Sequence, residues 1–305
     1  MTNEAGFIAA LKALATHPAA RGLEDDCAVL GDLVITHDMI GEGVHFLPEA
    51  DPADVAWRLV AVNLSDLAAA GAVPLGVVMG YSLSGDDDWD VRFVDGLKRA
   101  LEHFNVPLLG GDTVRVSEGS ARTLGLTAFG RAVAAPSRSG AKPGDTLWVT
   151  GTIGDAGAGL ALADRCRIEP CALLAAYNRP EPRLSEGKAL ASVVSAMMDI
   201  SDGLLIDARR MADASRISLH IALERIPLSP DFVTHMGGDH AAARITAATA
   251  GDDYELLFTM PADALPPVAA TRIGDCLAAD ADTPPLVLTF DGAPHPLPET
   301  LGYQH

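Results

Sequence analysis

The sequence predicts an α/β fold with mixed sheets, divided into two domains. Short β-prone apolar runs alternate with longer segments of helical periodicity along the chain. A length of 305 residues with 49% hydrophobic content suffices for one large domain or two ordinary ones. A stretch of small, Pro and Gly residues at 134–145 separates two apolar strands near the midpoint, which indicates a linker. We therefore expect one domain over 1–137 and another over 138–305.

In the first half, each expected element follows from its periodicity and its boundary residues. Apolar residues at helical spacing from Phe7 to Leu14 predict a short amphipathic helix. Asp51-Pro52 places a capping side chain before a proline at the first helical position, and Gly71 ends the same helix. The other expected elements are a hairpin of strands 27–30 and 33–39, strand 74–84, helix 89–104, strand 106–109 ending in Gly110-Gly111-Asp112, and strand 123–130.

The second half repeats this alternation. We expect strand 147–150, a Gly-rich turn and helix, helix 185–194, strand 196–200, helix 203–214, strands 217–223 and 254–260, and a Pro-rich tail with short strands. The turn after Val149 has Leu162 at the third glycine position of a dinucleotide fingerprint. A tight turn with small residues for close packing is therefore favoured over a Rossmann-type site.

The charge balance and hydropathy pattern exclude several functional classes. The chain has 22 Lys plus Arg against 41 Asp plus Glu, and its net charge of −19 repels nucleic acid and anionic lipid. No apolar run reaches the roughly 18 residues that span a bilayer, and no signal-type segment opens the chain. We expect a cytoplasmic protein that binds neither nucleic acid nor membranes. Four cysteines have neither disulfide nor zinc-site spacing and are expected to be reduced: Cys27, Cys166, Cys171 and Cys276.

Six aspartates stand at strand ends or in an apolar helix rather than on solvated faces: Asp26, Asp38, Asp66, Asp112, Asp199 and Asp202. Two unpaired carboxylates about 4 Å apart repel by roughly 4 kcal/mol at an effective dielectric of 20, so such a cluster needs cations or raised pKa values. A single acidic residue at a strand end is more often part of a turn. Together, at strand ends that converge on one sheet edge, the six predict a ligand site. Hydroxyls beside them, at Thr36, Ser65, Thr113 and Ser201, suit Mg²⁺ and phosphate.

Five segments of the chain carry a resemblance to a known family, although the P-loop and protein-kinase motifs are absent from the sequence. They are 36–46 (THDMIGEGVHF), 62–72 (VNLSDLAAAGA), 110–115 (GGDTVR), 198–204 (MDISDGL) and 251–256 (GDDYEL). Within the second and third segments, Asn-Leu-Ser-Asp (63–66) and Gly-Gly-Asp-Thr (110–113) also occur in aminoimidazole ribonucleotide synthetase and selenophosphate synthetase. His45-Phe46 together with the last segment is similar to the thiamine-monophosphate kinase family, and the match runs from about residue 23 to the end.

The resemblance implies both an activity and an assembly. ATP would donate its γ-phosphoryl group directly to the phosphate of thiamine monophosphate, giving thiamine diphosphate with the help of Mg²⁺. The expected fold is the two-domain fold of aminoimidazole ribonucleotide synthetase, in which the amino-terminal sheets of two subunits pair into a barrel. The domain over 1–137 would bind ATP and Mg²⁺ and form the homodimer, and the domain over 138–305 would complete the active site.

The resemblance also implies roles for individual residues. The metal ligands would be Asp26, Asp38, Asp66, Asp112, Asp199 and Asp202. ATP or its phosphates would contact Thr36, His37, Asp38, Gly111, Asp112, Arg131 and Ser201. Asp112, Asp202 and Arg131 would be catalytic, and thiamine monophosphate would contact His45, Asp252 and Tyr303, the last by stacking.

Several alternatives stay open from the sequence. Arg131 could equally form a surface salt bridge, and His45 could equally be satisfied by backbone groups. His37 and Asp252 depart from the Thr and Glu that are more usual in the family. The competing functions are another ATP-using member of the superfamily that acts on a different small anion, and a noncatalytic nucleotide or metal sensor.

Overall fold

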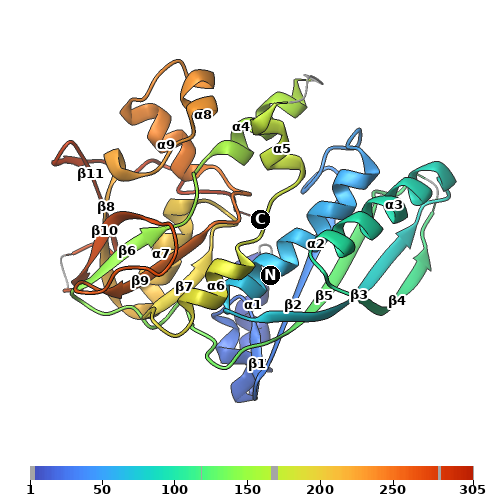
Figure 1. Ribbon diagram of the computed structural model, residues 1–305, viewed down its shortest axis with the longest axis horizontal. Helices are drawn as coiled ribbons and strands as arrows, with labels where there is room; N and C mark the ends of the chain where they lie inside the picture. The colour runs from blue at the N-terminus through green and yellow to red at the C-terminus, as the bar shows by residue number, and fades with distance from the viewer. Residues whose placement is uncertain (1–3, 118, 166–170, 281–282, 305) are drawn as a thin grey trace.

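The computed structural model of the protein describes residues 4–117, 119–165, 171–280 and 283–304. Two β-sheets lie beside each other, one in each half of the chain, and helices pack around both (Figure 1). The predicted α/β fold with mixed sheets is confirmed.

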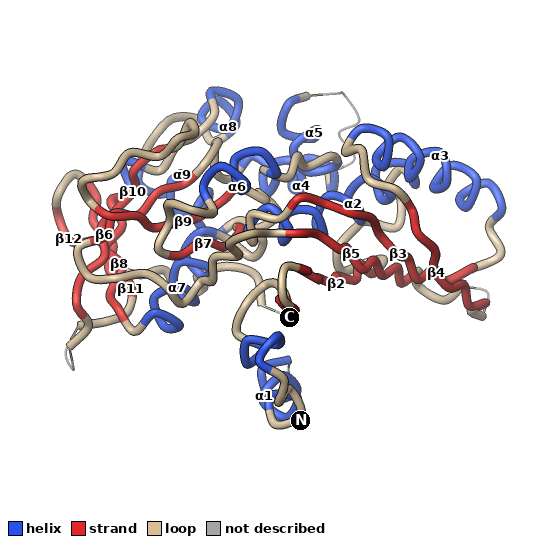
Figure 2. The backbone as a smooth tube through the Cα atoms, turned by 60° about the horizontal axis from the view of Figure 1, so that its bottom comes forward, coloured by secondary structure: helices blue, strands red, loops and turns tan. Residues whose placement is uncertain are grey.

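The amino-terminal sheet has the strand order β1-β2-β5-β3-β4. Its strands are β1 (Ala28–Leu30), β2 (Leu33–Gly41), β3 (Val73–Leu83), β4 (Leu108–Arg115) and β5 (Thr123–Arg131). Neighbouring strands are antiparallel except β3 and β4, which are parallel. Helices α2 (Pro52–Ala69) and α3 (Asp87–His103) lie over one face of this sheet (Figure 2).

Side chains of β2 alternate between the two faces of the sheet. Val34, Thr36 and Ile40 are buried beneath the helices, whereas His37 and Met39 are exposed on the opposite face. The same alternation holds along β5, where Leu124 and Leu126 are buried. The second face of the sheet is therefore open in the single chain.

Helix α2 is buried along almost its whole length because both halves of the molecule pack against it. Asp51 caps its first turn, accepting a hydrogen bond from the Ala53 N–H at 2.8 Å. At its other end Ala68 and Ala69 share a small core with Leu190, Met197 and Phe258 of the carboxy-terminal half. A Cβ on Gly187 would lie 2.0 Å from the Ala68 carbonyl oxygen, so only glycine permits this close approach.

The carboxy-terminal sheet has the strand order β12-β11-β8-β10-β6-β9-β7. Its strands are β6 (Asp145–Val149), β7 (Ala196–Asp199), β8 (Ile217–Ala222), β9 (Leu256–Pro261), β10 (Thr271–Ala278), β11 (Leu286–Phe290) and β12 (Ala293–His295). The helices of this half are α4 (Asp155–Asp164), α5 (Ala172–Asn178), α6 (Leu184–Leu190), α7 (Leu204–Ser215), α8 (Pro230–His235) and α9 (Ala241–Thr249). Helix α1 (Glu4–Lys12) projects from the body of the molecule (Figure 2) and is followed by the 3₁₀ turn η1 (Pro18–Leu23); a second such turn, η2 (Leu223–Arg225), follows β8.

One predicted element differs in a way that matters for the site. We expected the strand near 106–109 to end at Gly110-Gly111-Asp112, but β4 runs through these residues to Arg115. A Cβ on Gly111 would lie 2.0 Å from the Met79 carbonyl oxygen, so Gly111 permits close pairing with β3 and does not break the strand. Asp112 consequently lies in the middle of an edge strand.

Three further expectations from the sequence, on membrane spans, cysteines and the domain boundary, can be compared with the structure. No helix among the described residues is long and apolar enough to cross a membrane. Cys27, Cys171 and Cys276 are free thiols, and Cys166 lies outside the described residues. The domain boundary between 137 and 138, which falls in the segment that joins β5 to β6, stays a prediction.

Candidate active site

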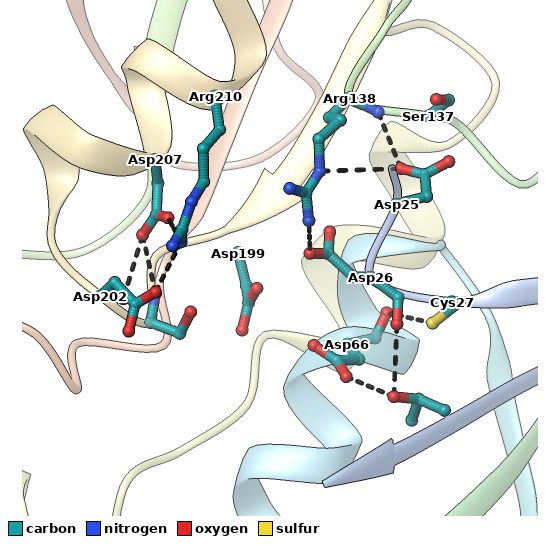
Figure 3. Close-up of polar contacts among 12 residues, drawn as sticks. Asp25, Asp26, Cys27, Asp66, Ser137, Arg138, Asp199, Asp202, Asp207 and Arg210 are labelled. Atoms are coloured by element: carbon teal, nitrogen blue, oxygen red, sulfur yellow. Dashed lines mark hydrogen bonds and ion pairs between the residues drawn. The ribbon is translucent and has the colours of Figure 1, made fainter. Parts of the chain in front are cut away.

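Three of the predicted aspartates meet where the two halves of the chain join. One carboxylate oxygen from each of Asp26, Asp66 and Asp199 lies within 4.8 Å of the others (Figure 3). Asp26 precedes β1, Asp66 lies in the last turn of α2, and Asp199 ends β7. Both sheets and the helix between them therefore build one acidic cluster.

Hydroxyl and amide side chains orient these carboxylates. Ser65 Oγ donates a hydrogen bond to Asp199 Oδ2 at 2.6 Å, and Thr36 Oγ1 donates to Asp66 Oδ2. Asn63 accepts a hydrogen bond from the backbone N–H of Asp38 at 2.9 Å. Thr36 is buried, so its hydroxyl orients a carboxylate and does not face the cavity, which differs from the predicted ATP contact.

Burial raises the pKa of every carboxyl in this group. It is the largest cause for Asp26, Asp66 and Asp199, and the neighbouring carboxylates add to it. The pKa of Asp38 rises to about 6 from an ordinary value of 3.8, again mainly through burial. Converging oxygen ligands that repel one another without a cation fit a hard divalent ion such as Mg²⁺.

Arg138 lies beside the acidic cluster and was missed by the sequence reasoning. Its guanidinium donates to Asp26 Oδ1, and its backbone N–H donates to Asp25 Oδ1 at 3.1 Å (Figure 3). The residue belongs to the 134–145 stretch that we interpreted as a linker. The sequence did offer one signal for Arg138, which is a positively charged residue in the segment that joins two acidic halves of the chain.

Arg210 of α7 provides a second cation on the opposite side of the cluster. Its guanidinium lies 2.6 Å from Asp202 Oδ2 and 2.7 Å from Asp207 Oδ1. The fully buried Asp207 also accepts hydrogen bonds from the N–H groups of Ser201 and Asp202, both at 3.1 Å. Burial raises the pKa of Asp207 to about 7. These bonds fix the turn that presents Asp202.

A cavity of about 1080 Å³ extends from the cluster between the two halves. The structure brings nine of the predicted site residues to its wall: Asp26, Asp38, Asp66, Asp199, Asp202, Ser201, His45, Asp252 and Tyr303. Such a concave site with convergent polar groups is the usual form of a small-molecule site.

Backbone hydrogen bonds hold the predicted substrate residues at this wall. His45 Nδ1 accepts from the Gly41 N–H at 3.1 Å, so this histidine is both bonded to backbone and part of the cavity. The Tyr303 N–H donates to the Asp202 carbonyl oxygen at 2.9 Å, which fixes the end of the chain beside the acidic cluster. The Tyr303 side chain remains 48% exposed.

Besides Thr36, four predicted residues are not brought to the cavity. His37 alternates with Thr36 and Asp38 along β2, so its side chain faces the open side of the sheet and bonds Thr127 Oγ1 at 2.8 Å. Gly111 and Asp112 are exposed on β4. Arg131 is exposed and pairs with Asp32 at 2.9 Å, as the alternative of a surface salt bridge had it, and its catalytic and ATP-binding role stays a prediction.

Comparison with known proteins identifies the family. The AIR synthase related protein N-terminal domain matches residues 24–132, and the corresponding C-terminal domain matches residues 142–260. The thiamine-monophosphate kinase of Salmonella typhimurium is 40% identical over 251 residues, which are 79% of this chain and 76% of that protein. The chain belongs to the thiamine-monophosphate kinase family. The resemblance predicted from the motifs is thereby confirmed.

Other members of the thiamine-monophosphate kinase family support this placement. The enzyme of Caulobacter vibrioides is 41% identical over 254 residues, covering 79% of this chain and 71% of that protein. The solved structure of AaThiL complexed with AMPPCP and TMP superposes with a TM-score of 0.86 at 30% identity, covering 99% of this chain and 97% of that one. The structure of the thiamine-monophosphate kinase from Stenotrophomonas maltophilia superposes with a TM-score of 0.74 at 33% identity, covering 95% of this chain and 96% of that one.

The raised carboxyl pKa values predict an unusual pH dependence of stability. In metal-free protein, the folded state binds more protons than the unfolded state between about pH 4 and pH 7, because the pKa values of Asp38 and Asp207 are raised to about 6 and about 7 from 3.8. The free energy of unfolding should therefore fall as pH rises through this range. Thermal unfolding in EDTA should give a lower midpoint at pH 7 than at pH 5, and Mg²⁺ should raise the midpoint at pH 7.

Two variants provide the control for this measurement. Asp38→Asn removes one titrating carboxyl and should weaken the pH dependence, whereas Asp87→Asn, on the exposed surface of α3, should leave it unchanged. An equal pH dependence in wild type and Asp38→Asn would contradict the assignment.

Proposed function

We propose that this protein transfers the γ-phosphoryl group of ATP to the phosphate of thiamine monophosphate, giving thiamine diphosphate. The observation that carries the proposal is the acidic cluster of Asp26, Asp66 and Asp199 at one end of a cavity whose wall also holds Asp252 and Tyr303. The family's enzymes of Salmonella typhimurium and Caulobacter vibrioides bear the name of this activity. Cytoplasmic location stays a prediction from the sequence.

The acceptor phosphate is already an anionic nucleophile, so the reaction demands no general base. The difficulty is to bring two polyanions together in line. Mg²⁺ would be held by the carboxylates at the cavity wall and would bridge and neutralise the phosphate oxygens. The ligands in the single chain would be Asp26, Asp38, Asp66, Asp199 and Asp202. Their orientation by Ser65, Thr36 and the Asp207 hydrogen bonds fixes the positions before the substrates bind.

Arg138 takes the role that the sequence assigned to Arg131. Its guanidinium contacts Asp26 of the acidic cluster directly, and this planar group is suited to bidentate contact with phosphate oxygens. Binding of ATP would offer it phosphate oxygens in place of Asp26. Ser201, on the turn held by Asp207, would contact the nucleotide from the carboxy-terminal half.

The other end of the cavity suits the thiamine moiety. Thiamine carries a cationic thiazolium ring, and the half-exposed ring of Tyr303 offers it an aromatic face. Asp252 provides a negative charge, and His45 lines the same cavity. The acceptor phosphate would then point toward the carboxylate-bound cations.

The proposal is tested with purified protein, ATP, Mg²⁺ and thiamine monophosphate, with thiamine diphosphate and ADP quantified by chromatography. We expect both products in equal amounts, no turnover in EDTA, and loss of at least 10²-fold in kcat for Asp199→Asn because a metal ligand is removed. Binding of thiamine monophosphate without ADP release would indicate a sensor. Neither binding nor turnover would indicate a different acceptor, and either result would overturn the proposal.

A paired substitution tests the exchange of arginine roles. Arg138→Ala should lower kcat/KM for ATP by about 10²-fold, since a charge-assisted contact to phosphate is lost. Arg131→Ala, which removes an exposed arginine paired with Asp32, should change kcat/KM less than twofold. Steady-state kinetics with varied ATP compares the two. A larger loss for Arg131→Ala would restore the role predicted from the sequence.

The open face of the amino-terminal sheet supports the predicted dimer as a second part of the proposal. Ile35 and Phe129 are paired neighbours on this face, and Met39, four residues further along β2 on the same face, is 54% exposed. In the order β2-β5-β3-β4, Asp112 on β4 lies three strand spacings, about 14 Å, from β2. Asp112 and Gly111 can therefore serve as a metal ligand and an ATP contact only if two sheets pair and β4 faces the site of a second subunit.

Light scattering tests this dimer. Wild type should have twice the mass of one chain, and Met39→Glu should give the single-chain mass because a charge is buried in the interface. The matched control is Val91→Glu, at a position of α3 that is 62% exposed on the helical side of the sheet. It should stay dimeric. A dimeric Met39→Glu with an unchanged unfolding midpoint would contradict pairing through this face.

A further inference from the structure

Arg58 is a charged residue in the middle of the apolar helix α2, and only 4% of it is exposed. Its guanidinium contacts two residues of the carboxy-terminal half. One nitrogen lies 2.5 Å from Asp252 Oδ2, and the other donates to the Tyr177 carbonyl oxygen at 2.6 Å. The guanidinium carbon also lies 4.5 Å from the centre of the Tyr177 ring. Both terminal nitrogens and one face of the guanidinium therefore contact the carboxy-terminal half, and the side chain also lines the cavity.

The carboxylate of Asp252 is held at both oxygens. Oδ2 pairs with Arg58, and Oδ1 lies 3.0 Å from the hydroxyl of Tyr254. Burial raises the pKa of Tyr254 far above its ordinary value, so the hydroxyl keeps its proton and donates. Each carboxylate oxygen can accept a second hydrogen bond, and the Asp252 side chain is 27% exposed at the cavity wall. One acceptor site on each oxygen thus remains for a ligand.

The backbone around Asp252 is strained and tied to the metal-binding turn. Asp252 and Tyr254 have φ angles of 70° and 50°. Residues other than glycine adopt such positive φ angles only at a cost in conformational free energy. The Asp252 N–H donates to the Ser201 carbonyl oxygen at 2.7 Å, and the Tyr254 N–H donates to the Ile200 carbonyl oxygen at 2.8 Å. These two backbone hydrogen bonds offset part of the cost of this conformation, and the side-chain contacts of Asp252 with Arg58 and Tyr254 add to them.

We propose that Arg58 is a positioning residue for substrate recognition, which holds the Asp252 carboxylate oriented toward the cationic thiamine moiety. The inference rests on the proposed function, because it concerns the acceptor end of the same cavity. Arg58 itself does not contact the reacting atoms. Its charge is neutralised by Asp252, so it places a carboxylate at the wall without offering a free cation that would repel the thiazolium ring.

A merely structural ion pair and a positioning residue predict different kinetics. Loss of a structural pair lowers the unfolding midpoint and raises KM for ATP and for thiamine monophosphate by similar factors. Loss of a positioning residue weakens the acceptor selectively, because the ATP end is built by other side chains, including Arg138 and Ser201. The ratio of the two KM changes therefore separates these possibilities.

The experiment compares Arg58→Lys and Arg58→Met with wild type in the kinase assay. Lysine keeps the charge but cannot contact Asp252 and the Tyr177 carbonyl together with the same geometry. We expect KM for thiamine monophosphate to rise about tenfold in Arg58→Lys and about 100-fold in Arg58→Met, with KM for ATP changed less than twofold. If Arg58→Met fails to fold, as its unfolding midpoint would show, Arg58→Lys alone decides. Equal changes in both KM values would overturn the proposal.

A double-mutant cycle and a matched control complete the test. In an Asp252→Asn background, Arg58→Lys should raise KM for thiamine monophosphate less than threefold further, because both changes affect one contact. Multiplicative effects of the two substitutions would overturn the proposal. The control is Arg179→Lys, since Arg179 pairs with Asp54 at 2.6 Å on the neighbouring segment and is half-exposed; its KM values should match wild type.

The outcome for wild type separates this inference from the proposed function. Wild-type turnover of thiamine monophosphate with an unchanged acceptor KM in Arg58→Lys overturns the positioning role alone. Absence of wild-type turnover overturns the proposed function, and the positioning role with it.

Discussion

Repulsion among buried carboxylates is the constraint on which the site depends. Asp26, Asp66 and Asp199 come from three distant segments, and holding their oxygens together opposes folding unless positive charge is supplied. Arg138 and Arg210 supply part of it from the two sides of the group (Figure 3). The remainder suits divalent cations. The same electrostatic requirement thus explains the raised pKa values and the arginine pairs.

The two halves of the molecule hold this group together through α2, whose small residues allow close contact. Ala68 approaches Gly187 so closely that no side chain fits between them. Residues on the same helix reach both sheets, and Ser65 bonds directly to Asp199 of the other half. The position of the three carboxylates relative to one another therefore depends on the junction between the two halves, and neither sheet could define it alone.

Much of this arrangement could be predicted from the sequence, because the decisive residues lie in short motifs with local rules. The periodicity of α2, its proline start and the aspartates of the five motifs required no knowledge of distant contacts. The location of His37 was predictable as well. Successive side chains of a strand point to opposite faces of the sheet, so His37 cannot lie on the face that Thr36 and Asp38 share. Asp112 was placed wrongly because Gly110-Gly111 suggested a strand end, whereas the close approach to Met79 makes glycine necessary inside β4. Arg138 and Arg58 depend on partners more than 100 residues away in the chain.

Helix α2 carries both Arg58, which pairs with Asp252, and Asp66 of the acidic cluster. Eight residues at a rise of 1.5 Å separate them by about 12 Å along the helix axis. The helix thereby fixes the distance between two parts of the cavity wall. On the proposed function, the distance from the acceptor's ring to its phosphate would have to agree with that length, and one regular element would thereby select acceptors by molecular size.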